Sequence, residues 1–151
     1  MRLILLLLSF SLIHSAVAQD TPANFDEELA SKLGVDDYGM KNYIFVLLKT
    51  GDTEIADKDS LNALFRGHFE NMEAMAESGK LALSGPFGKN DRVYRGLFIL
   101  NAESNEEAMQ LLNNDQAIAA GVFDVELTPW YGSAALPVFQ KTHDKIARKK
   151  P

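Results

Sequence analysis

Apolar residues along the chain fall into blocks whose spacing predicts alternating strands and helices. Continuous apolar runs predict strands over residues 42–50 and 94–101, and a shorter run predicts one over 81–84. Between the predicted strands 42–50 and 81–84, apolar residues spaced three and four apart predict a helix over residues 57–78. Gly79 is a suitable residue to end that helix.

The second half of the domain has the same order of predicted elements, a strand, a helix and a strand. Ser104 is followed three positions later by a glutamate, which is the capping-box pattern of a helix start. Asp115 can cap one further short helical turn, which ends at Gly121. Apolar and polar residues then alternate over 122–128, which predicts a last strand with one polar face, and Pro129 is expected to end it.

The predicted order is β-α-β-β-α-β, the α+β ferredoxin-like (split βαβ) arrangement, with an antiparallel sheet and helices on one face. Strands 42–50 and 94–101 are nevertheless apolar on both faces, so the second face of the sheet also needs a cover. We expect a second copy of the sheet to provide it. The prediction is therefore a homodimer of the dimeric α+β barrel type, with the two sheets packed face to face.

The ends of the chain differ in composition from this domain. Arg2, a short apolar run and the sequence Ala16-Val17-Ala18 are typical of a secretory signal peptide that is cleaved after Ala18. The polar stretch that follows contains one or two candidate helical turns, and the C-terminal stretch contains a weak helix candidate with a basic end. We thus predict a signal peptide (1–18), a polar N-terminal arm or spacer (19–40), a domain (41–132) and a C-terminal tail (133–151).

Charge and cysteine content narrow the possible partners. The chain has 15 basic and 21 acidic side chains; without Arg2 the mature chain has 14 and 21, a net charge of −7. This acidic surface argues against a nucleic-acid partner. The chain has no cysteine, which excludes disulfides, a thiol nucleophile and a lipoprotein anchor. We expect a periplasmic or secreted protein without a membrane anchor after cleavage.

His68 is the unusual residue of the first predicted helix. It lies on the apolar stripe, four residues after Leu64 and four before Met72, and therefore points towards the sheet. A lone histidine on an apolar face is more often a core residue whose nitrogens are hydrogen-bonded. A buried imidazole beside a carboxylate is also the usual general base of enzymes. The pattern leaves both interpretations open.

Asp115 is the candidate partner of that histidine. Helix capping alone would explain an aspartate at this position. A carboxylate that accepts backbone N–H bonds also stays ionised, so it could orient His68 and stabilise its imidazolium form. Because both helices lie on the same face of the predicted sheet, the two side chains could meet.

Residues 41–130 resemble the YciI-like (YCII-related) family. The motifs that carry the resemblance are YIFVLLKTGD, RGHFENM, GKLALSGPFG, RGLFILNAES and EEAMQLLNNDQAIAAGVFDVELTPW. Gln116 departs from the family, whose members commonly have proline after the aspartate. The resemblance implies a ferredoxin-like, usually dimeric fold with a site that pairs His68 and Asp115. It also implies proton-transfer or elimination chemistry on small cyclic or aromatic compounds.

Other residues are weaker candidates. Gly85 and Pro86 follow the second strand and are predicted to shape a substrate-binding wall, although a strand-ending turn explains them equally well. Arg66 and Arg95 could hold an anionic substrate, but exposed arginines are more often surface residues. Tyr94 and Tyr131 could line the pocket or simply pack. No spacing marks a metal site, and we expect neither a metal nor a cofactor.

Two functions are consistent with these residues. The first is a small cofactor-independent enzyme in which the pair His68 and Asp115 performs general acid/base chemistry on a small organic molecule. Proton transfer, isomerisation and elimination are the candidate reactions. The alternative is a non-catalytic periplasmic module that binds a small ligand or acts in stress, with His68 as a structural hydrogen-bond partner.

Overall fold

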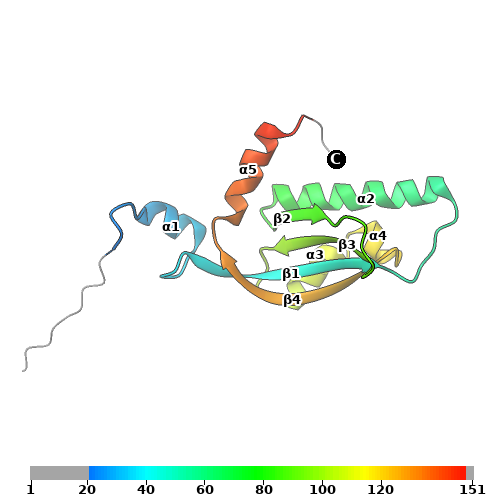
Figure 1. Cartoon of the computed structure of the whole chain (residues 1–151), viewed down its shortest axis with the longest axis horizontal. Helices are drawn as coiled ribbons and strands as arrows, with labels where there is room; N and C mark the ends of the chain where they lie inside the picture. The colour runs from blue at the N-terminus through cyan, green and yellow to red at the C-terminus, as the bar shows by residue number, and fades with distance from the viewer. Residues whose placement is uncertain (1–20, 149–151) are drawn as a thin grey trace, which may run out of the picture.

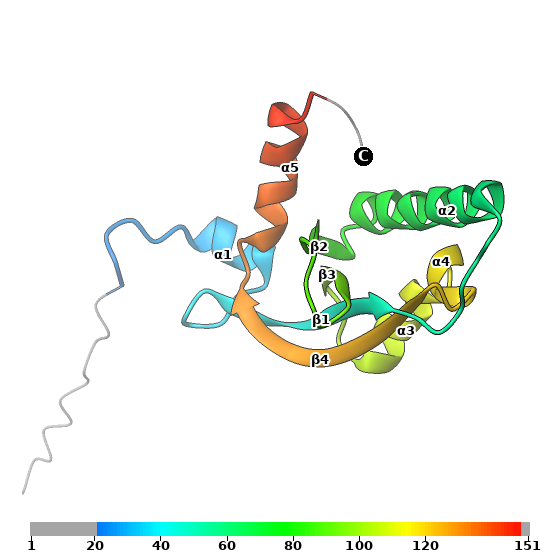
Figure 2. The same cartoon turned by 45° about the vertical axis from the view of Figure 1, so that its right-hand side comes forward.

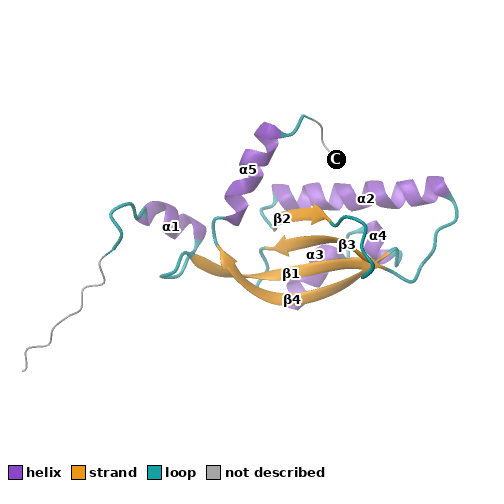
Figure 3. Cartoon of the chain, in the orientation of Figure 1, coloured by secondary structure: helices purple, strands orange, loops and turns teal. Residues whose placement is uncertain are grey.

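The computed structural model describes residues 21–148, without the side chains of residues 140, 141 and 144. The signal peptide predicted at 1–18 lies outside these residues. Helices and strands follow each other as shown in Figure 1, with the same elements coloured by type in Figure 3. The elements are α1 (Glu27–Leu33), β1 (Met40–Thr50), α2 (Lys58–Glu77), β2 (Leu81–Pro86), β3 (Tyr94–Leu100), α3 (Asn105–Leu112), α4 (Gln116–Ala119), β4 (Phe123–Ser133) and α5 (Leu136–Ile146).

The four strands form one antiparallel sheet in the order β2-β3-β1-β4. The strand β1 lies inside the sheet and pairs with β3 on one side and with β4 on the other. Together with the chain order β1-α2-β2-β3-α3-β4, this topology confirms the predicted α+β ferredoxin-like fold.

The main core lies between the sheet and the helices α2, α3 and α4. Alternate residues of β1 (Ile44, Val46 and Leu48) point to this side and are buried, because successive side chains of a strand point to opposite faces. Phe98 of β3 and Leu112 of α3 complete the centre of this core. Each fully buried side chain of this size contributes roughly 1.5–3 kcal/mol.

The opposite face of the sheet is also apolar, as the continuous strand runs predicted. Tyr43 and Ile99 are buried there, with Phe45 and Leu97 packed beside them. The structure differs from the expectation of helices on one face alone, because Leu136 at the start of α5 packs against this second cluster. The C-terminal tail, which the sequence marked only as a weak helix candidate, thus covers one end of the second face.

The last strand is longer than expected, because β4 continues through Pro129 to Ser133. Our expectation that Pro129 ends the strand was wrong. Since β4 is an edge strand that pairs only with β1, the missing N–H of a proline is tolerated where it faces away from the partner strand. The alternation over the earlier part of β4 is as predicted, with Asp124, Glu126 and Thr128 exposed.

Asp36 fixes the turn between α1 and β1. Its carboxylate accepts hydrogen bonds from the backbone N–H groups of Tyr38 and Met40, both at 2.9 Å, and from the hydroxyl of Tyr131 on β4. The Tyr131 hydrogen bond is the main cause that lowers the pKa of Asp36 below its ordinary value. The same bond raises the pKa of Tyr131 to about 12. The arm before β1 is therefore tied to the sheet.

We expect this turn to loosen in acid. A carboxyl whose pKa is lowered in the folded state stabilises that state above its unfolded pKa, and the contribution is lost as the pH falls through the folded pKa. Tyr131→Phe should raise the pKa of Asp36 towards its ordinary value, measured by a ¹³C carboxyl titration. Asp57, whose pKa is lowered mainly by Ser60, should titrate unchanged in the same spectra. An unchanged Asp36 would contradict the prediction.

Candidate active site

His68 is buried in an aromatic surround on the inner side of α2. Only 6% of the residue is exposed. Its ring stacks on Phe98 of β3 with the centroids 5.9 Å apart, and it meets Phe69 and Phe123 edge to face at 5.4 and 5.2 Å. These rings cover most of the imidazole, so a charged group next to it acts with less screening than it would at the surface.

Asp115 contacts this imidazole directly. Its Oδ2 lies 2.5 Å from Nδ1 of His68, and its carboxylate is fully buried. The other oxygen, Oδ1, accepts hydrogen bonds from the N–H groups of Ala117 and Ile118 at 3.0 and 3.2 Å, which makes Asp115 the N-cap of α4. The predicted contact is thus present, and one aspartate both caps α4 and binds the histidine.

Two features of α2 allow this approach. Gly67 precedes His68, and a Cβ built on it would lie 2.3 Å from Cδ of Gln116, so glycine here leaves room for the Gln116 side chain of α4. One turn later, Nδ2 of Asn71 donates a 3.3 Å hydrogen bond to the carbonyl of Leu111 at the end of α3. Both contacts place the α3–α4 connection, and with it Asp115, against the helix that carries His68.

The second ring nitrogen of His68, Nε2, faces away from Asp115. No hydrogen-bond partner for it lies within residues 21–148. Every fully buried side-chain nitrogen or oxygen in that part of the chain has a partner, so Nε2 is not fully buried. When Nδ1 donates its hydrogen to Asp115, Nε2 carries the free lone pair. In that tautomer, Nε2 is a hydrogen-bond acceptor at the edge of an apolar surround.

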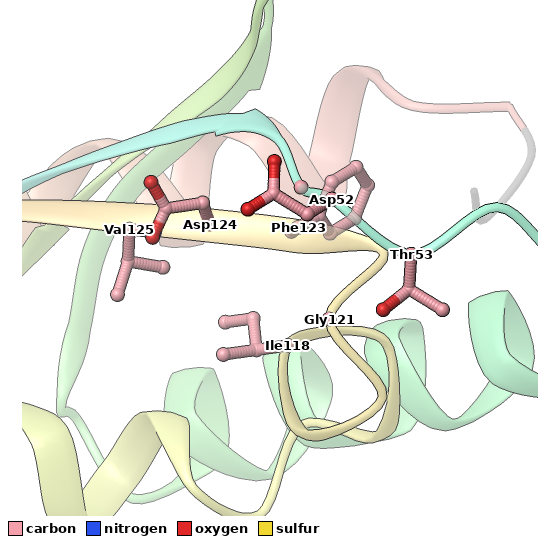
Figure 4. A pocket seen from close by; sticks show the side chains of 8 residues that line it. Asp52, Thr53, Ile118, Gly121, Phe123, Asp124 and Val125 are labelled. Carbon is pink, nitrogen blue, oxygen red and sulfur yellow. The ribbon is translucent and has the colours of Figure 1, made fainter.

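A pocket of about 290 Å³ lies next to this surround, between α4 and the start of β4 (Figure 4). Ile118, Phe123 and Val125 give it an apolar wall, and the segment Gly51–Thr53 forms the opposite rim. Phe123 belongs both to this wall and to the rings around His68. Phe123 thus connects the pocket lining with the rings around His68.

The rim of the pocket depends on a close backbone contact. The N–H groups of Gly51 and Thr53 donate to the carbonyls of Val122 and Gly121 at 2.9 and 3.1 Å. A Cβ on Gly51 would lie 2.1 Å from the Gly121 carbonyl oxygen, which is a backbone atom and cannot swing away. The two segments can approach this closely only because residue 51 has no side chain.

We expect Gly51→Ala to destabilise the protein by about 2–3 kcal/mol, because the added methyl forces the two rim segments apart. Urea unfolding of the variant measures this loss. Gly88→Ala is the matched control, since a Cβ at Gly88 meets no atom within 4 Å. Equal free energies of unfolding for the two variants would show that the two rim segments can move apart without a loss of stability.

The other sequence candidates lie apart from the pair. Gly85 is opposite Leu97, which packs on the second face of the sheet, so Gly85 opens to the face away from His68. A contact of Gly85 and Pro86 with a substrate stays a prediction. Arg66 is exposed, Arg95 donates to Thr50 at 2.6 Å, Tyr94 lies against Phe87, and Tyr131 binds Asp36.

Two surveys of residues 21–148 complete the description of the site. Among them, no three His, Asp or Glu side chains are grouped closely enough to hold a metal ion. No helix within the same range has the length and apolar character needed to cross a membrane.

The family model for the YCII-related domain matches residues 43–131, which is more than half of the chain. The chain belongs to the YCII-related family. The matched range runs from inside β1 to near the end of β4 and contains both His68 and Asp115. The helices α1 and α5 lie outside this YCII-related domain.

Among solved structures, the YCII-related domain is similar to 5-chloro-2-hydroxyhydroquinone dehydrochlorinase from Burkholderia phenoliruptrix AC1100, solved in complex with 2,5-dihydroxybenzoquinone. The two chains are 21% identical, with a TM-score of 0.41, and the match covers 58% of this chain and 92% of that one. We base no functional inference on a likeness this distant. No curated protein matches the chain significantly.

Several residues that build the site were not singled out from the sequence. The rings of Phe69, Phe98 and Phe123 read as ordinary core positions, and Asn71 as a polar helix residue. Gly67 carried a usable signal, because a glycine inside a helix costs about 1 kcal/mol and often marks a close packing contact. Its position next to His68 could have indicated where another element approaches.

Proposed function

We propose that this protein is a small cofactor-independent enzyme in which His68 acts as general acid and base and Asp115 orients it. The observation that carries the proposal is the free Nε2 of an imidazole whose Nδ1 is held by a buried carboxylate. Nε2 has no protein partner within the described residues and is not fully buried, so a substrate can approach it as a proton donor.

The proposed reaction is proton transfer at an acidic C–H bond of a small organic molecule. Nε2 of His68 takes the proton, and the electron pair of the broken C–H bond forms a new C=C bond. A leaving group on the neighbouring carbon then departs with its bonding pair, or a neighbouring carbonyl holds the pair as an enolate. The imidazolium returns its proton to the leaving group or to a carbon. Asp115 stabilises the imidazolium in between.

Phe123 and the adjoining pocket support a substrate site at this place. The pocket has room for a small molecule, and its apolar wall continues into the rings around His68. Neither elimination nor isomerisation of this kind changes the oxidation state of the whole molecule, so the proposed reaction requires no redox cofactor.

Nitrogen NMR of the histidines tests the proposed pair. In mildly alkaline solution, we expect His68 to carry its hydrogen on Nδ1, facing Asp115. In Asp115→Asn, the amide oxygen can still cap α4, which turns the amide NH₂ towards His68 and favours the opposite tautomer, with the hydrogen on Nε2. His143, which is exposed on α5, serves as the internal reference and should not change.

A His68 that already carries its hydrogen on Nε2 in the wild type would contradict the mechanism, because the reactive position would then be a donor. An unchanged tautomer in Asp115→Asn would show that the contact does not control the imidazole. Either result would favour the alternative, a non-catalytic ligand-binding module.

We also propose that the protein acts as an exported homodimer. The second sheet face supports this, because Leu83 and Trp130 remain 40% and 39% exposed beside the apolar cluster of Tyr43 and Ile99. Packing of two such faces would cover them. Light scattering on the mature protein should give the mass of two chains; the mass of one chain would remove the dimer from the proposal.

A further inference from the structure

The C-terminal helix α5 has an apolar side that the sheet covers only at its beginning. Leu136 packs against the cluster of Tyr43 and Ile99. Phe139 and Ile146, which are seven residues apart and so lie on one side of the helix, are 61% and 73% exposed. Figures 1 and 2 show that α5 extends away from the sheet beyond its first turn.

The N-terminal helix α1 has the same property. It contains no buried residue, and Phe25 and Leu29 are 53% and 46% exposed. It precedes the YCII-related domain at residues 43–131, whereas α5 follows it. The chain therefore carries two appended helices with exposed apolar side chains.

The two appended segments have opposite charges of the same size. Residues 21–40 contain five acidic and one basic side chain, a net charge of −4. Residues 133–151 contain five basic and one acidic side chain, a net charge of +4. Complementary charge next to exposed apolar side chains is the composition of a protein–protein contact with an apolar centre and a charged rim.

Hydrogen bonds fix the segments next to the two helices. Asp36 fixes the turn after α1 through Tyr38, Met40 and Tyr131. The N–H of Ala134 donates to the carbonyl of Gly39 at 3.0 Å, which fixes the start of the tail. In this arrangement Leu29 and Phe139 are both exposed, so each keeps apolar surface that a second copy can cover.

We propose that α1 of one protomer packs on α5 of a second copy, and that the two-fold symmetry of the dimer makes this contact twice. The apolar residues Phe25 and Leu29 would face Phe139 and Ile146, with Glu27 and Glu28 opposite Lys145 and Arg148. The inference rests on the second copy proposed above and not on the catalytic pair. It assigns to the two appended helices the function of clasping the dimer.

Cysteine cross-linking of the full mature chain tests this contact, because the wild-type sequence has no cysteine and every disulfide must come from the introduced pair. Lys32 is exposed one turn after Leu29, and Thr142 is exposed between Val138 and Ile146 on one stripe of α5. On mild oxidation, Lys32→Cys with Thr142→Cys should give a covalent dimer on a non-reducing gel.

The control pair is Lys58→Cys with Thr142→Cys, because Lys58 is exposed at the start of α2, at the opposite end of the sheet from α5 (Figure 1). This pair should stay monomeric on the gel. A disulfide within one chain in the test pair, or none at all, would overturn the clasp. If light scattering still shows a dimer in that case, the clasp alone has failed and the sheet-to-sheet dimer stands.

Charge reversal gives an independent measurement. Lys145→Glu with Arg148→Glu should weaken dimerisation about tenfold, and Glu27→Lys with Glu28→Lys should have a similar effect. The four substitutions combined should restore the wild-type dissociation constant, since each reversed helix again faces its opposite charge. Failure of the combination to restore it would contradict the pairing.

A basic helix with exposed apolar residues is also typical of proteins that bind anionic membrane surfaces. Vesicles of phosphatidylglycerol and phosphatidylcholine separate the two cases. If Lys145→Glu with Arg148→Glu abolishes vesicle binding and leaves the dimer dissociation constant unchanged, the proposal is wrong and α5 has a lipid partner.

Discussion

Asp115→Ala should destabilise the protein by about 2–5 kcal/mol, the summed cost of the hydrogen bonds that it removes. The substitution removes three hydrogen bonds at once. Two of them cap α4, and loss of a cap costs about 1–2 kcal/mol. The third binds Nδ1 of His68, which would be left without a partner in an apolar surround, at a further cost of about 1–3 kcal/mol. Urea unfolding at neutral pH measures the sum.

Asp57→Ala is the matched control for this prediction. Asp57 is the N-cap of α2 and accepts hydrogen bonds from Ser60, but it is exposed and binds no histidine. Its removal should cost about 1 kcal/mol, the cost of a cap alone. If Asp115→Ala costs no more than Asp57→Ala, the carboxylate of Asp115 is a helix cap whose contact with His68 contributes nothing to stability.

Periodicity and topology predicted that His68 and Asp115 could meet, and the family resemblance implied that they form a pair. Helical spacing places His68 on the inner side of α2, and a split βαβ order places both long helices on one face of the sheet. Nothing local to either residue fixes the distance between them. That distance depends on Gly67 and on Asn71, whose effects appear only when α4 and α3 are packed against α2.

The ends of the strands were also not predictable from the local sequence alone. Continuous apolar runs predicted that both faces of β1 and β3 need a cover; on the second face Tyr43 and Ile99 are buried, and Phe45 and Leu97 are partly buried. The end of β4 could not be predicted from Pro129, because a proline ends a central strand and is tolerated in an edge strand, and strand order is a property of the whole sheet. The packing of Leu136 on the second face likewise depends on where β4 ends.

His68→Gln should lower turnover by about 10²–10⁴-fold while the fold survives. Proton transfer by a positioned side chain contributes this factor, and glutamine cannot take up the proton. Its amide NH₂ can still donate to Asp115, so the buried carboxylate keeps a partner and the main energetic reason for unfolding is removed. The measurement is incorporation of deuterium from D₂O into small C–H acids, which reports proton abstraction for any candidate substrate screened.

A comparison of three variants shows whether His68 takes part in the reaction or only packs in the core. His143→Gln removes the exposed histidine of α5 and should leave the exchange rate unchanged. Thermal unfolding should place the melting temperature of His68→Gln near that of the wild type. His68→Leu should be inactive and less stable, because it leaves the carboxylate of Asp115 buried without its partner. A His68→Leu variant that is more stable than the wild type and equally active would show that position 68 serves the core alone.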